Sequence, residues 1–379
     1  MNMQEVSSPS VPLVFSEAAP SRRFEVVLGI GLLLAILTIF WTQQRYPALL
    51  GKLHAGHAVK VAGTISFDAV LPVRCEMSLP ERVGRTSVNW IWTNRFGMFF
   101  AIPFGAALMT LMGQAVRPKR FASPAANVLC GALAGAPMGV CTNCATPVAQ
   151  SLLRGGASTR MTVAAMISSP SFNPVVVVMA FLLFPLPLAA LRLAVAAGLL
   201  LLLPVLVPET DAPVRINPLG LPWERKVSLL SRSAGFGRQF VRNVAMVAWM
   251  TLPWLLLAAI LGALAAELIP AYGTHLHATL LSVFAVAVLG TLLPVPMALD
   301  VALAFVLYRA GAPLALVSVL LCTLGPVSVY SLGALGKELG RGSMLRLAAA
   351  TMALSSSRSS AYSDSVRPRF MARWRKATL

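Results

Sequence analysis

Stretches of about 20 apolar residues recur along this chain, and they restrict its fold more than any other feature of the sequence. After a first stretch at 24–41, seven more and one shorter, weaker one follow: 96–114, 124–140, 161–182, 186–207, 244–266, 278–295, 313–335, and then 343–355. Among the seven, only 186–207 carries a charge, at Arg192, which lies near enough to one end to snorkel. Helices that are apolar on all sides have lipid as their natural solvent. The pattern therefore predicts an all-α, polytopic membrane protein with about 8–10 transmembrane helices.

The composition supports this class and excludes others. Of the 379 residues, 57% are hydrophobic and 12% are charged, whereas soluble domains carry about 25% charged residues. A soluble enzyme, a disordered chain and a disulfide scaffold are thus excluded. The net charge of +18 would suggest a protein that binds nucleic acid. The basic residues lie in loops and tails, however, as they do in inner-membrane proteins. We expect the lipid bilayer of the inner (plasma) membrane as the partner, and no nucleic acid.

Loop charges and apolar stretches together predict the organisation of the chain. No small-x-small cleavage site follows the first stretch, so we interpret it as a retained helix. Positive loops at 115–123 and 209–243 indicate the cytoplasmic side. The loop 267–277 has no Lys or Arg, so we expect it on the outer side. An aromatic run at Trp90–Trp92 resembles an interfacial anchor. The expected order is a polar cytoplasmic tail (1–23), a first transmembrane helix (24–41), an extracytoplasmic segment without a span (42–95), a first permease repeat (96–208), a cytoplasmic loop (209–243), a second permease repeat (244–355) and a basic tail (356–379).

Two parts of the chain align with each other, which indicates an internal duplication. Met138–Ser158 and Leu293–Pro313 match without gaps at six of 21 positions, including an Arg-x-Gly-Ala turn that starts at Arg154 in one and at Arg309 in the other. Gly135 and Gly290 match nearby. The loop after the first span is basic in the first copy and not in the second, which predicts opposite orientations. Inverted repeats are typical of transporters.

Short, interrupted helices are predicted inside both repeats. The segment Cys141-Thr-Asn-Cys-Ala-Thr-Pro147 ends in a Thr-Pro pair, an expected helix start, and Gly155-Gly156 would end that helix after about eight residues. Such a half-helix cannot cross a bilayer. The second copy has a short segment at 296–309. The predicted helix breaks lie at four prolines, of which Pro174 follows a capping asparagine: Pro147, Pro170, Pro174 and Pro326.

The unwound stretches carry the candidate site residues. Cys141 and Cys144 would lie at the positive end of a half-helix, where sulfur suits soft solutes such as trivalent arsenic. A C-x-x-C pair also fits a redox dithiol, and small residues also fit close helix packing. With Asn143 and Asn173, the two cysteines form the predicted substrate-binding set. No catalytic residue, metal site or cofactor is predicted, because the histidine pairs His54/His57 and His275/His277 have no third ligand nearby.

Asp300 is the candidate coupling residue. It is the only acid between Glu267 and Glu338, within the short segment of the second repeat. A carboxylate in a membrane is costly and points to function, either proton coupling or pairing with a charged substrate. The alternative is a structural ion pair with Arg192 or Arg309.

The run C-T-N-C-A-T-P-V-A-Q-S-L-L-R-G-G-A-S, followed by S-S-P-S-F-N-P, resembles the ArsP-type (YraQ-like) predicted permease family over roughly residues 90–335. The resemblance implies a bacterial plasma-membrane permease with two related halves, linked to efflux of trivalent organoarsenicals. It places Cys141, Cys144, Pro147 and Pro170 on motif positions. In the second half, where the family often has a comparable cysteine-bearing run, this chain has Pro296 and Leu299.

The sequence as a whole predicts a secondary transporter and not an enzyme. It would export a small-molecule or metalloid substrate by alternating access around 141–174 and 296–326, with proton coupling. A membrane dithiol-disulfide electron carrier is the alternative, and a non-transporting scaffold is a weaker one. No G-x-x-x-x-G-K-[ST] loop is present, which argues against an ATP-driven pump in this chain. The sequence gives no indication of the oligomeric state.

Overall fold

The computed structural model describes residues 23–55, 70–74, 76–113, 121–209, 229–272 and 279–365, and all regular structure in these ranges is helical. The confirmed class is therefore an all-α, multi-pass membrane protein. Several predictions fall on residues outside the described ranges. These residues are the tail at 1–22, His57, the basic loop at 114–120, positions 210–228 of the predicted loop 209–243, the segment 273–278 with its two histidines, and the tail after 365.

The first helix is longer than its apolar stretch predicts. Helix α1 (Arg23–Phe40) continues through a π-helical turn (Trp41–Arg45) into α2 (Tyr46–Ala55), and Phe24–Gly51 is long and apolar enough to span. The prediction that the helix stops at Trp41 is wrong. Trp41 Nε1 donates a hydrogen bond to the carbonyl oxygen of Pro137 at 2.7 Å. This contact fixes the π-turn against the body of the protein.

The segment 42–95 was predicted to contain no span, but helix α3 (Leu79–Gly113) begins within it. Its first turns are charged, and Arg85 pairs with Glu81 one turn earlier at 3.0 Å, an i,i+4 pair that supports a helix. Trp90 is not an interfacial anchor, because it is fully buried and its Nε1 donates to Pro294 O at 3.3 Å. Only Trp92, 46% exposed, keeps a surface position.

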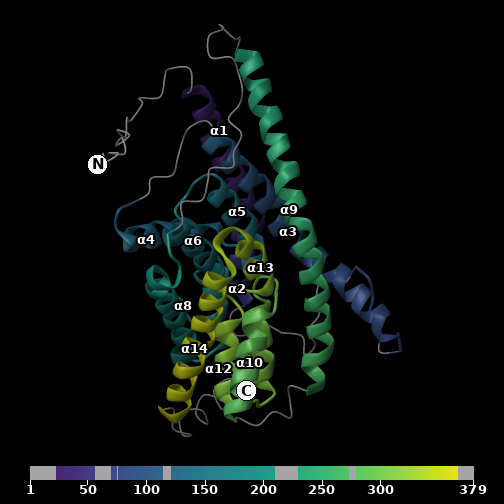
Figure 1. Cartoon of the computed structure of the whole chain (residues 1–379). Coiled ribbons are helices and arrows are strands. Elements are labelled where there is room, and N and C mark those ends of the chain that lie inside the picture. Colours follow the sequence, from purple (N-terminus) through teal and green to yellow (C-terminus); the bar gives the residue numbers. More distant parts are fainter. Residues whose placement is uncertain are drawn as a thin grey trace, which may run out of the picture.

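Two series of helices with the same order of lengths follow. Each has one long helix, then short ones, then a last helix of 21 residues or more. The first series is α3, α4 (Pro124–Gly135), α5 (Thr142–Arg154), α6 (Thr159–Ser171), α7 (Pro174–Leu183) and α8 (Leu186–Leu206). The second is α9 (Leu229–Tyr272), α10 (Leu280–Leu292), α11 (Leu299–Arg309), α12 (Leu314–Thr323), α13 (Val329–Leu339) and α14 (Arg341–Ser365). Figure 1 shows α9 as a long rod along one side of the molecule, beside α3.

Matched positions of the two series have the same local geometry. Gly156 and Gly311 end α5 and α11 with left-handed φ angles of 84° and 82°, and the residue after each donates its N–H back to a leucine carbonyl five residues earlier. Gly135 and Gly290 lie against hydroxyl side chains, Ser168 and Thr323, that are 33 residues later in both series. These agreements support the predicted duplication. The opposite orientation of the two copies stays a prediction.

Fewer helices than expected are full-length spans. Within the described residues four are long and apolar enough, and α6 with α7, bent by 42°, makes up to five. The predicted spans at 124–140 and 278–295 are helices of 12 and 13 residues, and the span at 313–335 is broken between α12 and α13. Two boundaries also differ: α9 begins inside the predicted loop 209–243, and α14 continues to Ser365, beyond the predicted start of the tail.

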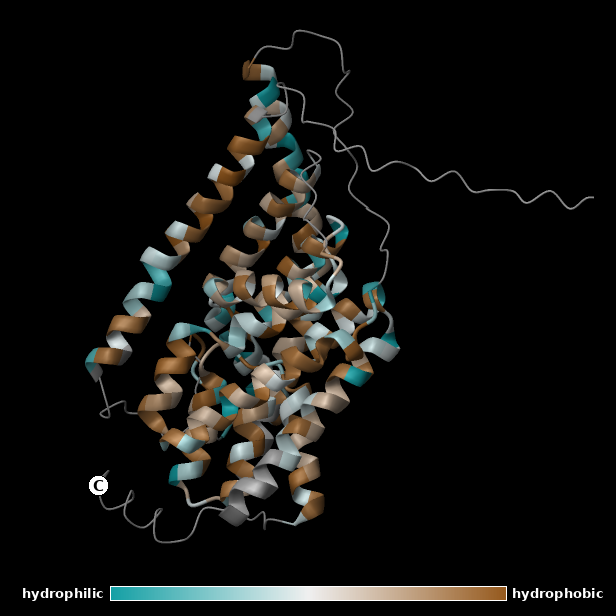
Figure 2. Cartoon of the chain, turned by 90° about the vertical axis from the view of Figure 1, so that its left-hand side faces the viewer, coloured by the Kyte–Doolittle hydropathy of each residue, from teal (hydrophilic) through white to brown (hydrophobic). Residues whose placement is uncertain are grey.

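Large apolar side chains on the outer helices point away from the protein. Leu201 is 80% exposed, Trp249 79% and Leu280 89%. Figure 2 shows apolar residues along most of the length of the helices. An apolar exterior of this kind is matched to lipid. Polar side chains are instead buried between the short helices, where non-helical backbone is shielded by protein.

Candidate functional site

A small pocket lies where four interruptions of the chain meet. These are the start of α5, the end of α6, the segment before α11 and the break between α12 and α13. The space open to the centre of a water-sized sphere is about 10 Å³, or about one water molecule. The residues that line it are Cys141, Thr142, Pro170, Val176, Val295, Pro296, Met297, Ala298, Asp300, Leu324 and Gly325. The interrupted segments of both halves therefore share one site.

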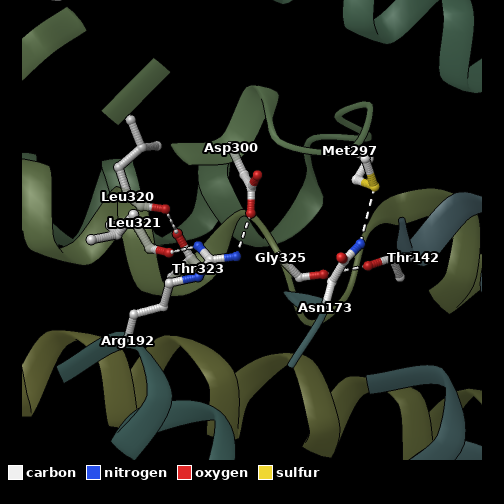
Figure 3. A network of polar contacts seen from close by, with 9 residues as sticks. All are labelled: Thr142, Asn173, Arg192, Met297, Asp300, Leu320, Leu321, Thr323 and Gly325. Atoms are coloured by element: carbon white, nitrogen blue, oxygen red, sulfur yellow. Dashed lines mark hydrogen bonds and ion pairs between the residues drawn. The ribbon is translucent and has the colours of Figure 1, made fainter. Parts of the chain in front are cut away.

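Hydrogen bonds across the pocket join the two halves. Thr142 Oγ1 donates to the carbonyl oxygen of Gly325, as Figure 3 shows. Asn143 Nδ2 donates to Val295 O at 3.3 Å, and Asn143 Oδ1 accepts from Ser328 Oγ at 3.0 Å. Thr142 lines the pocket and was not predicted, whereas the predicted residues Asn143, Cys144 and Asn173 lie beside it and are not among its lining residues. The break at Gly325-Pro326 is confirmed, since α12 ends at Thr323 and α13 starts at Val329.

Asn173 caps α7 as predicted. Its Oδ1 accepts from Val175 N at 3.0 Å, and Pro174 takes the first helical position. The other side of the amide bridges the halves: Nδ2 lies 2.8 Å from Gly139 O and 3.0 Å from Met297 Sδ (Figure 3). Because one short side chain both starts a helix and holds two loops, the break between α6 and α7 is fixed in place.

Helix α5 starts earlier than the Thr-Pro pair predicts. Its N-cap is Cys141, and Thr146 and Pro147 lie inside the helix. Thr146 Oγ1 instead bonds to Thr142 O at 2.7 Å, so it serves no cap. The half-helix itself is retained, because 13 residues rise only about 20 Å, less than the hydrocarbon core. Pro170 also lies inside a helix, in the last turn of α6.

The two thiols lie together at the N-terminus of α5. Cys141 Sγ is 3.1 Å from Cys144 Sγ and 3.7 Å from Asn94 Oδ1, and both cysteines are buried and free. Helix α3 approaches them closely. A Cβ at Gly97 would lie 2.5 Å from Cys144 Sγ, so only glycine fits there without a shift. Of the two cysteines only Cys141 lines the pocket, and Cys144 lies behind it; the second sulfur in the lining, which sequence reasoning missed, is the thioether of Met297.

Asp300 is paired with Arg192 and not with Arg309. Both partners are 4% exposed, and the carboxylate oxygen Oδ2 accepts from Arg192 Nη2 (Figure 3). Arg192 Nη1 also donates to Leu321 O at 2.5 Å, at the end of α12. Asp300 Oδ1 is buried without a hydrogen-bond partner, and Asp300 lines the pocket. The expectation that Arg192 snorkels to a membrane surface is wrong, because α8 is packed against the second half and turns this side chain inward.

Two further charged residues join parts of the structure that are far apart in sequence. Arg154, expected at an interfacial turn, pairs with Glu338 of α13 at 3.1 Å. Arg45, which sequence reasoning passed over, is 8% exposed in the π-turn of the first span. The only signal in the sequence was the polar run Thr-Gln-Gln-Arg directly after an apolar stretch. Among the described residues, no three His, Cys, Asp or Glu side chains gather as a metal site would require.

Interrupted helices that meet at a buried polar pocket, inside an apolar helical exterior, are typical of membrane permeases. The comparison with known proteins agrees with this class. The chain is 31% identical over 214 residues to UPF0718 protein YraQ of Escherichia coli (strain K12). The match supports the predicted relationship to YraQ-like proteins, and it says nothing of the ArsP-type members. It covers 54% of this chain and 59% of that protein, which is less than two thirds of the relative's length. No family model and no solved structure matches the chain.

Proposed function

We propose that this chain is a secondary transporter of an inner (plasma) membrane that exports a small thiophilic solute, such as a trivalent organoarsenical. The observation that carries the proposal is the shared pocket, where interrupted segments of both halves meet around buried sulfur. The two proposed permease repeats, 96–208 and 244–355, correspond to the helix series α3–α8 and α9–α14.

In the structure the two halves are too close together for a solute to bind between them. The pocket has room for about one water molecule, so a solute enters only when the halves move apart. The bonds that must break are those that join the two halves in and beside the pocket, and they include Thr142 to Gly325, Ser328 to Asn143 and the ion pair of Arg192 with Asp300. Each neutral hydrogen bond of this kind is worth about 1 kcal/mol net. Small rigid-body motion of one half against the other then gives alternating access.

Sulfur ligands from two directions favour a soft solute. Cys141 and Cys144 come from α5, and Met297 comes from the segment before α11. Thiolate and thioether ligands prefer soft ions and metalloids over hard ones. The second half lacks the cysteine-bearing run expected from the resemblance, and Met297, aligned with Thr142, supplies a sulfur there instead. We infer that the solute binds to the two thiols, with the thioether as a weaker third contact.

Asp300 is the proposed coupling group. Its free Oδ1 belongs to the pocket, and its other oxygen accepts from Arg192. Protonation of the carboxylate removes its charge and loosens the ion pair between α11 and α8. A proton that binds from one side of the membrane and leaves on the other would therefore change the contact between the two halves.

Everted membrane vesicles that contain the full chain test this function. Uptake of phenylarsine oxide into them corresponds to export from cells. We expect the Cys141→Ser/Cys144→Ser variant to lose uptake at normal expression, because oxygen binds trivalent arsenic less tightly than sulfur. Cys130→Ser is the matched control, since Cys130 is half-buried on α4 and is not among the pocket residues. Unchanged uptake in the double variant would remove the cysteines from the mechanism.

One observation favours the alternative electron carrier. The two sulfurs, 3.1 Å apart in a C-x-x-C segment, are placed so that oxidation needs little movement. Such a carrier must cycle between thiol and disulfide during growth. Acid quenching and alkylation of whole cells would separate the two forms by mass. A constant, fully reduced pair during uptake supports the transporter, whereas substrate-dependent oxidation supports the carrier.

A further inference from the structure

Arg45 is a buried cation that has no carboxylate partner in the part of the chain that the structure describes. It lies in the first span and is 8% exposed, and its Nε has no hydrogen-bond partner. The ion pairs found among the described residues leave it out. A buried charge without a partner is costly, and within a membrane such a charge points to function. Arg192, in contrast, is neutralised by Asp300.

The π-turn holds the arginine in a fixed place. The backbone N–H of Tyr46 bonds to Trp41 O, and the Trp41 side chain bonds to Pro137 O at 2.7 Å. The guanidinium carbon of Arg45 lies 4.4 Å from the centre of the Phe40 ring, which stacks in turn on Phe100. One face of the cation therefore rests on an aromatic ring, at a distance suited to a cation–π contact. Single π-turns are frequent at functional sites.

The arginine is directed at the loop that leads into α5. A Cβ at Gly139 would lie 3.7 Å from both Cδ and Nε of Arg45 and 3.8 Å from Asn173 Oδ1. Gly139 has a φ of 60°, which favours glycine, so the space that a Cβ would fill stays free next to both groups. Gly139 precedes Cys141 by only two residues, so the arginine lies beside the loop that leads directly to the first thiol. It therefore lies next to both the start of the dithiol segment and the capping asparagine.

The N-terminus of α5 adds to the positive potential at this place. No side chain caps this helix of 13 residues, and its first N–H groups follow Cys141 directly. A helix N-terminus attracts anions through these N–H groups and the helix dipole. Two independent features, an unpaired buried arginine and an uncapped helix start, thus favour negative charge beside the sulfur pair.

We propose that Arg45 and the N-terminus of α5 form an anion-binding subsite beside Cys141 and Cys144, so that the transported thiophilic solute carries an anionic group. This inference rests on the proposed function and narrows its substrate class. A neutral arsenical would bind to the thiols and leave the arginine without a partner. A solute with a carboxylate or another acidic group satisfies both the thiols and the arginine.

Two probes of almost equal shape test the subsite in the purified full chain. These are 4-carboxyphenylarsonous acid, which is anionic, and its 4-carbamoyl analogue, which is neutral. We expect the wild type to bind the anionic probe at least about tenfold tighter, the effect of one hydrogen bond to a charged group. Arg45→Gln should abolish the difference and leave the neutral probe unaffected, and Arg45→Lys should keep part of it. Arg95→Gln is the control, since Arg95 also lies over an aromatic ring, 4.0 Å from that of Trp92.

The outcomes of this binding experiment distinguish a failure of the subsite from a failure of the proposed function. Equal binding of both probes to the wild type, with binding still lost in Cys141→Ser/Cys144→Ser, overturns the subsite and leaves the proposed function intact. Equal loss of both probes in a folded Arg45→Gln protein also overturns it, because the arginine then serves the thiols and not the solute. Binding of both probes that survives the cysteine substitutions contradicts the proposed function itself.

Discussion

The buried pair of Asp300 and Arg192 offers the sharpest test of how the halves are held together. Both residues are 4% exposed, and each also has an atom without a partner, Oδ1 and Nε. Removal of one member of such a pair costs about 3–5 kcal/mol, because the other charge stays buried alone. Asp300→Asn should reach the upper part of this range, since an arginine cannot lose its proton. Arg192→Gln should cost less, since a carboxylate can take up a proton and become neutral.

The double variant separates stability from transport. Asp300→Asn with Arg192→Gln leaves no buried charge, so stability should return to within about 1 kcal/mol of the wild type, whereas two independent single losses of about 3–5 kcal/mol each would add up to about 6–10 kcal/mol. Unfolding of the purified protein in mixed micelles with increasing denaturing detergent measures these differences. Proton-driven uptake into everted vesicles should stay lost in the double variant, because no carboxylate remains to carry the proton.

Two results would refute this reasoning. Single variants that each cost less than about 1 kcal/mol would show that the pair is solvated and not buried. A double variant that regains both stability and uptake would show that the pair is only structural. In that second case Asp300 would have no coupling role, although the shared pocket would remain.

Three other contacts give predictions that need the same two assays. Gly135→Ala should cost about 1–3 kcal/mol because its Cβ would lie 2.6 Å from Ala165 Cα across the α4–α6 contact, whereas Gly31→Ala, with nothing within 4 Å, should be neutral or stabilising. Arg154→Glu should lower uptake by placing two acids together at the ends of α5 and α13, and Glu338→Arg in the same protein should restore it. Asn173→Ala removes the N-cap of α7, so it should lower stability by about 1–2 kcal/mol and should weaken solute binding.

Local features of the helices were predictable because they depend on residues close together in sequence. Asn173 before Pro174 predicts a helix start, and the structure has one there. The glycines after Arg154 and Arg309 predict helix ends, and both have left-handed glycines. The Thr146-Pro147 pair was the exception, since Thr146 bonds back to Thr142 and the helix begins a turn earlier. Proline is tolerated there because neighbouring helices bury this turn completely.

Contacts between distant segments could not be predicted in the same way. An apolar stretch looks the same whether it faces lipid or another helix, so the burial of Trp90 and the inward position of Arg192 were missed. The partner of Asp300 was one of two arginines by sequence, and only the packing of α8 on the second half decides between them. Met297 and Arg45 belong to no sequence motif, so their positions near the site could not be predicted.

The sequence by itself determined that this protein is helical and lies in lipid, it located several helix ends and it indicated the duplication, because these features follow from composition, capping residues and spacing along the chain. Tertiary structure alone decided which interruptions meet, which charge is neutralised and which is left unpaired. The reason is that a pocket joins residues more than 150 positions apart, such as Thr142 and Gly325, whose approach depends on the packing of whole helices. No local rule of sequence records that packing.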